Sequence, residues 1–335
     1  MNKSIFNGPL FIIGMPRSGT KLLKELINNH SNISLCNEET QFIPGFLRRF
    51  NGCINTNRRS NLWKYFKYFK NTSFYTISEN NLTFDVLARS INKYDPASFV
   101  EYILKYYSGD YESADCSNHI WGDKSPLYAF EIPLLNSFFP DAKFIHIIRD
   151  FRDVCLSYNK TWGKSLYSTA EKWRQLISEV DMSTRVLHRN KYYQLNYEKL
   201  ISNPTAELRL LCDVIGIDFE PDMVKLTKVI EHYGDAKDSQ DILSNNYDKF
   251  MEALPPSQTK RIERIVGPIA LKKGYRIHNS VEHKPLNRFQ NYFLLLRDLI
   301  SYGKHILFEE RGVKQGSKYL IRQLKDARFS FPYYY

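Results

Sequence analysis

Apolar runs of strand type alternate along the chain with stretches of helical periodicity. The strand-type runs cover residues 9–14, 119–122, 142–148 and 192–196. Helices are expected around them, at residues 20–29, 40–50, 97–107, 166–188 and 204–215. This alternation predicts an α/β fold with a central, mainly parallel sheet and helices on both faces. Because such sheets bind ligands beyond the carboxyl ends of their strands, the residues that follow each strand are the candidates for chemistry.

The rest of the pattern suggests how the chain is organised. Residues 51–95 are rich in Asn, Ser, Lys and aromatic residues, and we interpret them as an insertion of short helices and loops near the acceptor site, within a domain of residues 1–280. Residues 281–335 are expected to form a basic, partly helical extension, because residues 283–335 hold ten Lys or Arg against four Asp or Glu. We favour packing of this extension across the domain. Contact of a basic amphipathic helix with an anionic membrane surface is the alternative.

The first strand leads into a turn that predicts a phosphate-binding loop. Residues 14–21, G-M-P-R-S-G-T-K, join this strand to the next helix. Turn amides and the helix dipole both favour an anion there. The glycines have the spacing of a nucleotide-triphosphate loop, but Thr20 precedes Lys21 and Arg17 lies inside the loop, so a phosphate is expected more than Mg-ATP. A plain Gly/Pro turn is the alternative.

The strand at residues 142–148 ends at a second candidate anion site. Arg149 follows this strand, and Ser157 lies eight residues later in the expected next helix. A guanidinium provides a forked, permanent positive charge and a hydroxyl adds a neutral donor, which suits a phosphate. The alternative is an N-capped helix with Arg149 in a surface ion pair.

Together the two motifs resemble those of the sulfotransferases, whose donor is 3′-phosphoadenosine 5′-phosphosulfate (PAPS). The form P-R-S-G-T is similar to that of the tyrosylprotein, heparan and bacterial branches, and the resemblance covers roughly residues 8–275. It implies a P-loop NTPase-like three-layer fold. It also implies that Arg149 and Ser157 bind the 3′-phosphate of the donor, and that the 5′-phosphosulfate contacts Arg17, Ser18, Gly19, Thr20 and Lys21.

The same resemblance supplies a candidate general base. Residues 36–44, C-N-E-E-T-Q-F-I-P, are similar to a tyrosylprotein sulfotransferase segment in which the second Glu is the base, which assigns this role to Glu39. A base is needed because an alcohol attacks sulfur poorly while it keeps its proton. We expect burial or the neighbouring Glu38 to raise the pKa of Glu39 toward neutrality. An acidic pair that faces a helix dipole is the other interpretation, which we prefer for Glu38.

Further positions follow from the resemblance. In W-G-D-K-S-P, residues 121–126, Lys124 is expected to stabilise the leaving charge, together with Arg17. Weaker donor contacts are expected from Tyr197, Ser244 and Lys249. The Arg residues that grip the substrate in the tyrosylprotein branch are replaced by Gln41 and Gly45, which weakens the case for an acidic tyrosine peptide.

Composition limits the ligands, metals and cell compartment that suit this chain. The net charge of +11 implies an anionic ligand or partner, and no motif that reads nucleic acid is evident. The five cysteines are scattered without metal-type spacing, and we expect no metal, because a sulfuryl group carries less charge than a phosphoryl group. With neither a signal peptide nor a run of about 18 apolar residues, the sequence predicts a cytoplasmic, bacterial-type enzyme.

The sequence therefore predicts a PAPS-dependent O-sulfotransferase. A sugar hydroxyl of a glycan or glycolipid is the favoured acceptor, followed by a small alcohol and then a peptide tyrosine. A P-loop nucleotide kinase or NTPase and a non-catalytic anion-binding protein are the alternatives.

Overall fold

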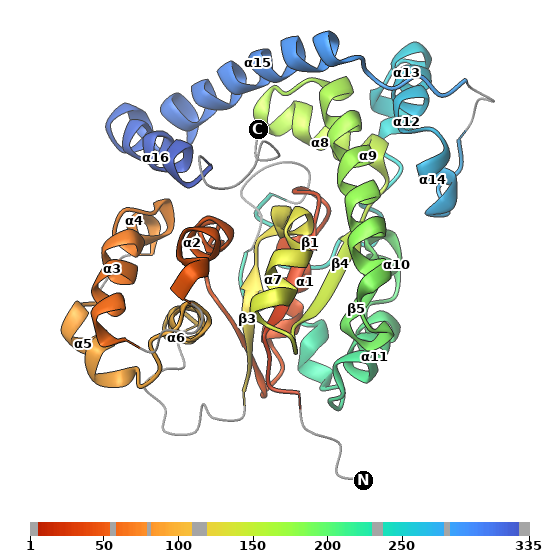
Figure 1. Cartoon of the computed structure of the whole chain (residues 1–335). Coiled ribbons are helices and arrows are strands. Elements are labelled where there is room, and N and C mark those ends of the chain that lie inside the picture. Colours follow the sequence, from red (N-terminus) through yellow and green to blue (C-terminus); the bar gives the residue numbers. More distant parts are fainter. Residues whose placement is uncertain are drawn as a thin grey trace.

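The computed structural model describes residues 6–53, 58–78, 82–108, 119–229, 237–277 and 282–327. In this part of the chain a parallel five-stranded sheet in the order β2-β3-β1-β4-β5 forms the centre (Figure 1). The strands are β1 (Leu10–Gly14), β2 (Ile33–Leu35), β3 (Ile120–Lys124), β4 (Lys143–Ile148) and β5 (Tyr192–Asn196). The predicted α/β class with a central parallel sheet is confirmed.

Strand β1 lies in the middle of the sheet because both of its faces are apolar. Phe11 and Ile13 belong to one hydrophobic cluster, whereas Leu10 and Ile12 belong to another. The face that holds Phe11 and Ile13 is covered by α7 (Ile132–Phe138), α8 (Phe151–Trp162) and α9 (Leu166–Ser183). The face that holds Leu10 and Ile12 is covered by α1 (Thr20–Asn28), α10 (Tyr197–Ser202) and α11 (Pro204–Ile215). The result is the three-layer arrangement expected from the alternation of strands and helices.

Sequence analysis missed strand β2. It has only three residues at the edge of the sheet, where Ile33 pairs with Ile120 and Leu35 with Gly122. A run this short gives no alternation to detect. Its position matters for function, because the candidate base Glu39 lies just beyond its end.

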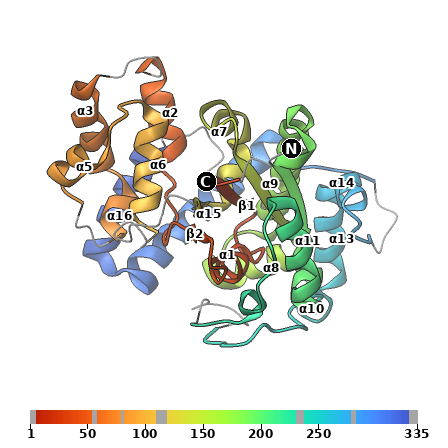
Figure 2. The ribbon, with the colours of Figure 1, turned by 90° about the horizontal axis from the view of Figure 1, so that it is seen from below.

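The segment after β2 forms a separate group of helices beside the sheet (Figure 2). These are α2 (Ile43–Phe50), α3 (Arg59–Phe69), α4 (Ser73–Ile77), α5 (Phe84–Ser90) and α6 (Pro96–Tyr106). Stacked and edge-on aromatic rings hold them together. Phe46, for example, lies 5.0 Å from Phe99 and 5.4 Å from Tyr65 between ring centroids. This packing explains the aromatic richness of residues 51–95.

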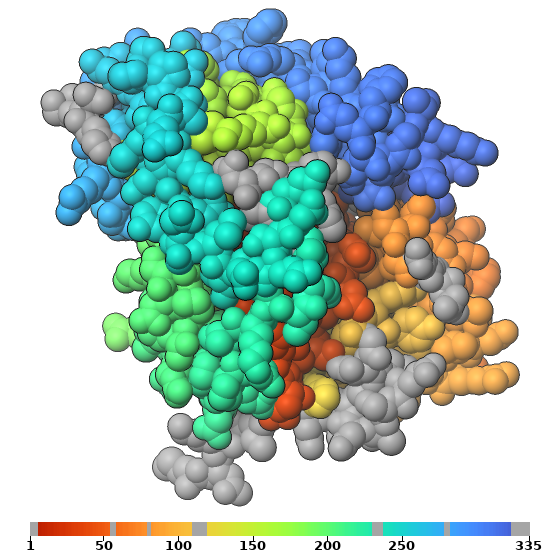
Figure 3. All heavy atoms as spheres, turned by 180° about the vertical axis from the view of Figure 1, so that it is seen from behind, coloured from red at the N-terminus to blue at the C-terminus, as the bar shows by residue number. Residues whose placement is uncertain are grey.

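The C-terminal helices lie across the end of the molecule that holds the carboxyl ends of the strands (Figures 1 and 3). After α12 (Phe250–Ala253), α13 (Pro256–Val266) and α14 (Pro268–Lys272), the chain forms α15 (Arg288–Lys304), a π-helical turn (His305–Glu310) and α16 (Gly312–Ala327). Helix α15 packs on α9 and α16 on α4. The carboxylate of Asp298 on α15 accepts hydrogen bonds from the Ser165 amide, at 2.8 Å, and from the Ser168 hydroxyl. The division of the chain at residue 280 stays a prediction.

None of the helices in the described ranges has the length and apolar character that crossing a membrane requires.

Candidate active site

The two predicted anion sites lie side by side at the centre of the sheet. Strands β1 and β4 are neighbours, so the loop after Gly14 and the start of α8 meet. The Arg17 guanidinium donates to the Ser157 hydroxyl at 3.1 Å, and the Arg149 guanidinium donates to the Arg17 carbonyl at 3.2 Å. Residues more than 130 positions apart in sequence thus form one cationic corner.

The predicted phosphate-binding loop, residues 14–21, contains a buried polar atom without a partner among the described residues. The Ser18 amide donates to the Met15 carbonyl at 3.1 Å, so the turn itself occupies that amide. The Ser18 hydroxyl is fully buried and has no hydrogen-bond partner among the described residues. A buried hydroxyl of this kind fits a loop whose ligand supplies the missing oxygen.

Gly19 keeps the start of α1 open. It caps the helix with φ +89°, and a Cβ atom there would lie 2.3 Å from the Tyr197 ring. Thr20 is buried in the first turn of α1, whereas Lys21 is exposed and lines the neighbouring cavity. A glycine is therefore required both by the backbone conformation and by the close approach of an aromatic ring.

A small cavity of about 80 Å³ adjoins Arg149. Its walls hold most of the predicted donor residues: Arg17, Gly19, Arg149, Ser157, Tyr197 and Lys249. The Arg149 guanidinium lies over the Tyr197 ring, 4.4 Å from its centroid, and is mostly buried. Arg149 Nε is buried and has no hydrogen-bond partner among the described residues.

Two polar residues of the segment that closes this cavity, Ser244 and Asn246, lie in different places, and the donor contact expected of Ser244 stays a prediction. Ser244 is exposed and lines neither cavity, so the structure does not bring it to the site. Asn246 lines the cavity instead: its carbonyl accepts from Arg149 at 2.9 Å and its amide donates to the Tyr197 hydroxyl at 2.8 Å. Ser244 and Asn246 are only two positions apart in sequence, so the path of the loop decides which of them lines the cavity.

Two of the three predicted catalytic side chains, Glu39 and Lys124, are in contact. The Lys124 ammonium at the end of β3 donates to Glu39 Oε1, and the Gln41 amide donates to Glu39 Oε2 at 3.3 Å. The buried hydrogen bond from Thr40 to the Asp123 carboxylate, at 2.8 Å, ties the two strand ends together and fixes this pair.

The expectation of a raised pKa for Glu39 is wrong. Burial alone would raise the pKa of Glu39, but the charge and hydrogen bond of Lys124, with the hydrogen bond from Gln41, lower it below its ordinary value. Glu38 lies on the same cavity wall but is exposed. The raised pKa belongs to Asp123, where burial lifts it to about 6. Glu39 is therefore a carboxylate held ionised by its partner.

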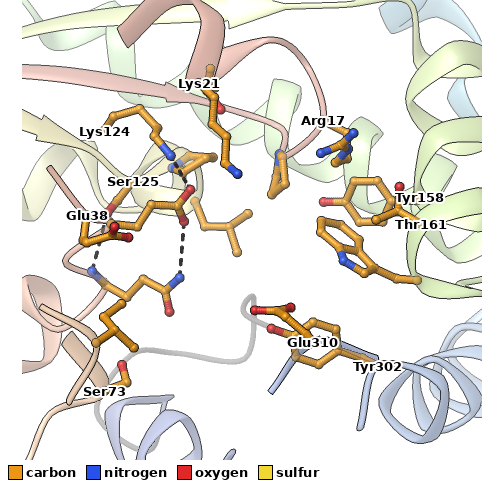
Figure 4. Close-up of a pocket in the computed structure, with 18 of the residues that line it drawn as sticks. Arg17, Lys21, Glu38, Ser73, Lys124, Ser125, Tyr158, Thr161, Tyr302 and Glu310 are labelled. Atoms are coloured by element: carbon orange, nitrogen blue, oxygen red, sulfur yellow. Dashed lines mark hydrogen bonds and ion pairs between the residues drawn. The ribbon is translucent and has the colours of Figure 1, made fainter. Parts of the chain in front are cut away.

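Glu39 and Lys124 line a larger cavity of about 680 Å³. Figure 4 shows this cavity with Lys124 on its wall. Arg17 lines this cavity as well as the smaller one, so the two spaces meet at that residue. The opposite wall includes Tyr302 and Glu310 of the C-terminal extension, and Tyr319 of α16 also lines the cavity. Helix α4 contributes Ser73 and Ile77. No pattern along the chain predicts these wall residues, because their positions depend on how distant helices pack together.

Within the described ranges, no three His, Cys, Asp or Glu side chains lie together as metal ligands would. Cys36, Cys155 and Cys212 are free thiols, and Cys116 lies outside the described residues.

Comparisons with known proteins identify relatives of this architecture. The sequence profile of the sulfotransferase family matches residues 9–221. Protein-tyrosine sulfotransferase A of Caenorhabditis elegans is 26% identical over 234 residues, which cover 67% of this chain and 52% of that enzyme. The omega-hydroxy-beta-dihydromenaquinone-9 sulfotransferase Stf3 of Mycobacterium bovis is 28% identical over 173 residues, 46% of this chain and 41% of that enzyme. The chain thus spans about half or less of the length of these two relatives.

Among solved structures, the sulfotransferase domain from the Synechococcus PCC 7002 olefin synthase is similar in fold. It aligns with a TM-score of 0.54 and 21% identity, over 83% of this chain and 98% of that domain.

Proposed function

The chain belongs to the sulfotransferase family, and we propose that it transfers a sulfuryl group from PAPS to an acceptor hydroxyl. The products are 3′-phosphoadenosine 5′-phosphate (PAP) and an O-sulfate ester. The observation that carries this proposal is the contact of Arg17 with both Ser157 and Arg149, together with the place of Arg17 on the walls of both cavities. One anion site could hold any phosphate, whereas two sites joined in this way suit a donor with phosphates at both ends of its adenosine.

In the proposed reaction, Glu39 takes the proton of the acceptor hydroxyl. The freed oxygen forms a bond to sulfur while the bond from sulfur to the 5′-phosphate oxygen breaks, and that oxygen keeps the electron pair. Arg17 and Lys124 stabilise its growing negative charge, which is the kind of preorganised electrostatic support that contributes most in many enzymes. Before the reaction Lys124 is bound to Glu39, so its shift toward the donor would release Glu39 to act as base.

The donor residues fit this assignment chemically. The unpartnered Ser18 hydroxyl and Arg149 Nε offer hydrogen bonds to phosphate oxygens, and Gly19 leaves room at the helix start. Tyr197 offers a ring face beneath Arg149. Lys249 lies on the same cavity wall.

The acceptor is proposed to be a sugar hydroxyl of a glycan or glycolipid, or a small alcohol. The large cavity has room for a substrate of this size, and one relative is named for an omega-hydroxylated menaquinone. A peptide tyrosine is the second candidate, because several relatives are named protein-tyrosine sulfotransferases. The cytoplasmic location stays a prediction.

Calorimetry with PAP, ADP and ATP, with and without Mg²⁺, tests the donor. We expect PAP to bind tightly without metal and ADP and ATP to bind weakly. A preference for Mg-ATP would instead identify a kinase or NTPase.

Transfer of labelled sulfate from PAPS into an extract of the source organism tests the reaction. Glu39→Gln is expected to lower transfer by roughly 100-fold to 10,000-fold, with PAP affinity unchanged. Glu38→Gln is the matched control and should keep its activity. If both variants keep the biological role without any transfer, the protein is a non-catalytic anion binder.

The outer surface of α15 supports contact with an anionic membrane. Phe289, Tyr292, Phe293 and Ile300 are each more than 60% exposed, and Leu296 adds to the same row. The exposed charges of α15, Arg288, Arg297 and Lys304, are all positive, whereas its one acidic residue is buried. An apolar row edged by cations complements the surface of an anionic bilayer.

Vesicle sedimentation tests this contact. The protein should sediment with phosphatidylglycerol vesicles and not with phosphatidylcholine, and a double variant with Phe289→Ser and Phe293→Ser should remain in the supernatant. Leu210→Ser, at a half-exposed position on α11, is the control. A stable dimer that buries the α15 row, or equal binding to both vesicles, would contradict the proposal.

A further inference from the structure

A pair of lysines lines the large cavity and has no role in the proposed reaction. Lys164 follows Gly163, the residue that ends α8, and Lys172 lies two turns into α9. Both line the cavity that also holds Glu39 and Lys124. They come from elements other than the phosphate-binding loop, and neither lines the small cavity beside Arg149.

These two lysines differ from four of the other six cations of the cavity. Lys24, Lys124, Lys228 and Arg311 each lie within 4.0 Å of a carboxylate oxygen. Within the described residues, the side-chain ammonium groups of Lys164 and Lys172 have no carboxylate at that distance and no hydrogen bond, although the Lys164 carbonyl accepts one from the Asn159 amide at 2.9 Å. Lys164 lies over the Tyr302 ring, 4.7 Å from its centroid, and near the Trp162 ring at 5.5 Å.

Asp298 is the nearby acidic residue, and it is already engaged. Its carboxylate accepts from the Ser165 amide and the Ser168 hydroxyl, which fixes it between α9 and α15. One occupied carboxylate therefore faces two ammonium groups. The wall around Lys164, Lys172, Asp298 and Tyr302 keeps an excess of positive charge.

Such an arrangement is unfavourable without a ligand. Burial lowers the pKa of Lys164 to about 8. Burial, and then repulsion by Lys164, lowers the pKa of Lys172 to about 7. A bound anion would remove this penalty, because it pairs with both charges in a space partly screened from water.

We propose that Lys164 and Lys172 bind an anionic group of the acceptor, a carboxylate or a phosphate, at a distance from the hydroxyl that receives the sulfuryl group. The inference rests on the proposed function and narrows it: the acceptor is a hydroxyl compound that already carries negative charge. The two lysines are specificity-determining residues, whereas Glu39 and Lys124 act on the reacting atoms. The aromatic rings beside Lys164 suit an apolar or sugar segment between the two ends of the acceptor.

The identity of the sulfated product gives the first test. Labelled sulfate is transferred from PAPS into an extract of the source organism, and the main product is identified by mass spectrometry. A carboxylate or phosphate besides the new sulfate supports the inference. A product without one overturns it while leaving sulfuryl transfer intact, and absence of any transfer together with absence of PAP binding overturns both.

Variants of the two lysines give the second test. Lys164→Met and Lys172→Met keep the apolar stem and remove the charge. Each should raise the KM for the purified acceptor roughly 10-fold to 100-fold, the effect of losing one charge-assisted hydrogen bond, with kcat and PAP affinity within about twofold. Lys260→Met, at an exposed position on α13, is the control. An unchanged KM overturns the inference, and so does an equal loss of PAP affinity, which would assign the lysines to the donor.

Chemical acetylation of the lysines tests anion binding without any turnover. In the PAP-loaded protein, the acetylation rates of Lys164, Lys172 and Lys260 are followed by peptide mass spectrometry with glucuronate, inorganic phosphate or glucose present. Protection of the first two lysines by either anion and not by glucose supports the inference, and the more effective anion distinguishes carboxylate from phosphate. Equal rates with all three additions contradict it.

Discussion

At the scale of single residues, the ion pair of Glu39 and Lys124 sets the pH behaviour of the proposed site. Glu39 is half-buried, and without Lys124 the effect of burial on its pKa would dominate. The pair keeps Glu39 ionised at neutral pH, which is the protonation state that a base requires. Without the donor, the Lys124 ammonium is bound to Glu39.

Lys124→Met should change the pH profile as well as the rate. Because Lys124 lowers the pKa of Glu39, its removal should raise that pKa. A base is lost as the pH falls through its pKa, so the acidic limb of kcat/KM should move to higher pH in the variant. The pH profile of kcat/KM for PAPS, which reports the free enzyme in which the pair is intact, measures this shift. A limb that stays in place would show that Glu39 is not the base.

Arg149→Gln should weaken the binding of PAP more than that of ADP. Arg149 is the proposed partner of the 3′-phosphate, which ADP lacks. Loss of a hydrogen bond to a charged group, about 1.5–3 kcal/mol, corresponds to roughly 10-fold to 150-fold in PAP affinity. Calorimetry with both nucleotides measures the difference, and thermal unfolding checks the fold, because Arg149 also binds the Arg17 and Asn246 carbonyls. An equal loss for both nucleotides would contradict the assignment.

Metal removal should have no effect on transfer. Arg17 and Lys124 supply the positive charge that Mg²⁺ provides in phosphoryl transfer. Activity in EDTA should therefore equal activity in buffer alone. A loss that Mg²⁺ restores would show that the charge of these side chains is insufficient.

At the scale of elements, the corner between β1 and α1 depends on one glycine. Gly19 combines a left-handed backbone with close contact to the Tyr197 ring of the neighbouring α10. The loop, the start of α1 and the start of α10 are thus packed as a unit. Any side chain at this position must displace the ring or the loop.

Gly19→Ala should lower both stability and PAP affinity. A left-handed conformation costs an alanine about 1–2 kcal/mol, and the added Cβ would also collide with Tyr197. Gly216→Ala is a matched control, because its φ is +92° but nothing lies within 4 Å of the added atom. Thermal unfolding and PAP calorimetry compare the two variants. Equal losses of stability and of PAP affinity in the two variants would show that the contact with the Tyr197 ring does not contribute.

At the scale of the whole molecule, the C-terminal extension completes the acceptor cavity. The Asp298 carboxylate joins α15 to the start of α9, and Tyr302 and Tyr319 then form part of the cavity wall. Glu39 and Lys124 lie more than 170 positions before the residues of this wall in the sequence. The proposed acceptor site exists only when the extension is docked.

Asp298→Asn should loosen this docking. The variant keeps the shape but loses the charge in two hydrogen bonds, each worth about 1.5–3 kcal/mol. Limited proteolysis should cut α15 and α16 faster, and the KM for the acceptor should rise while PAP affinity is kept. Asp222→Asn, whose side chain is exposed, is the control. Unchanged proteolysis would show that other contacts hold the extension.

The sequence alone was sufficient for the local features of this protein. Neighbouring residues determine these features, so they can be predicted from the order of residues. They are the turns between strands and helices, the loop from Gly14 to Lys21, and the spacing of Arg149 and Ser157. These features led to the α/β class and to the sulfotransferase family. They also led to Glu39 and Lys124, although through resemblance to known enzymes.

Only the tertiary structure decided how these pieces affect one another. The pKa of Glu39 depends on a lysine 85 residues away, and the choice of Asn246 over Ser244 depends on the path of a loop. The wall that holds Lys164, Lys172 and Tyr302 forms where α8, α9 and α15 meet. Burial and charge act through space, so their balance is set by which distant segments come into contact and not by the order of residues along the chain.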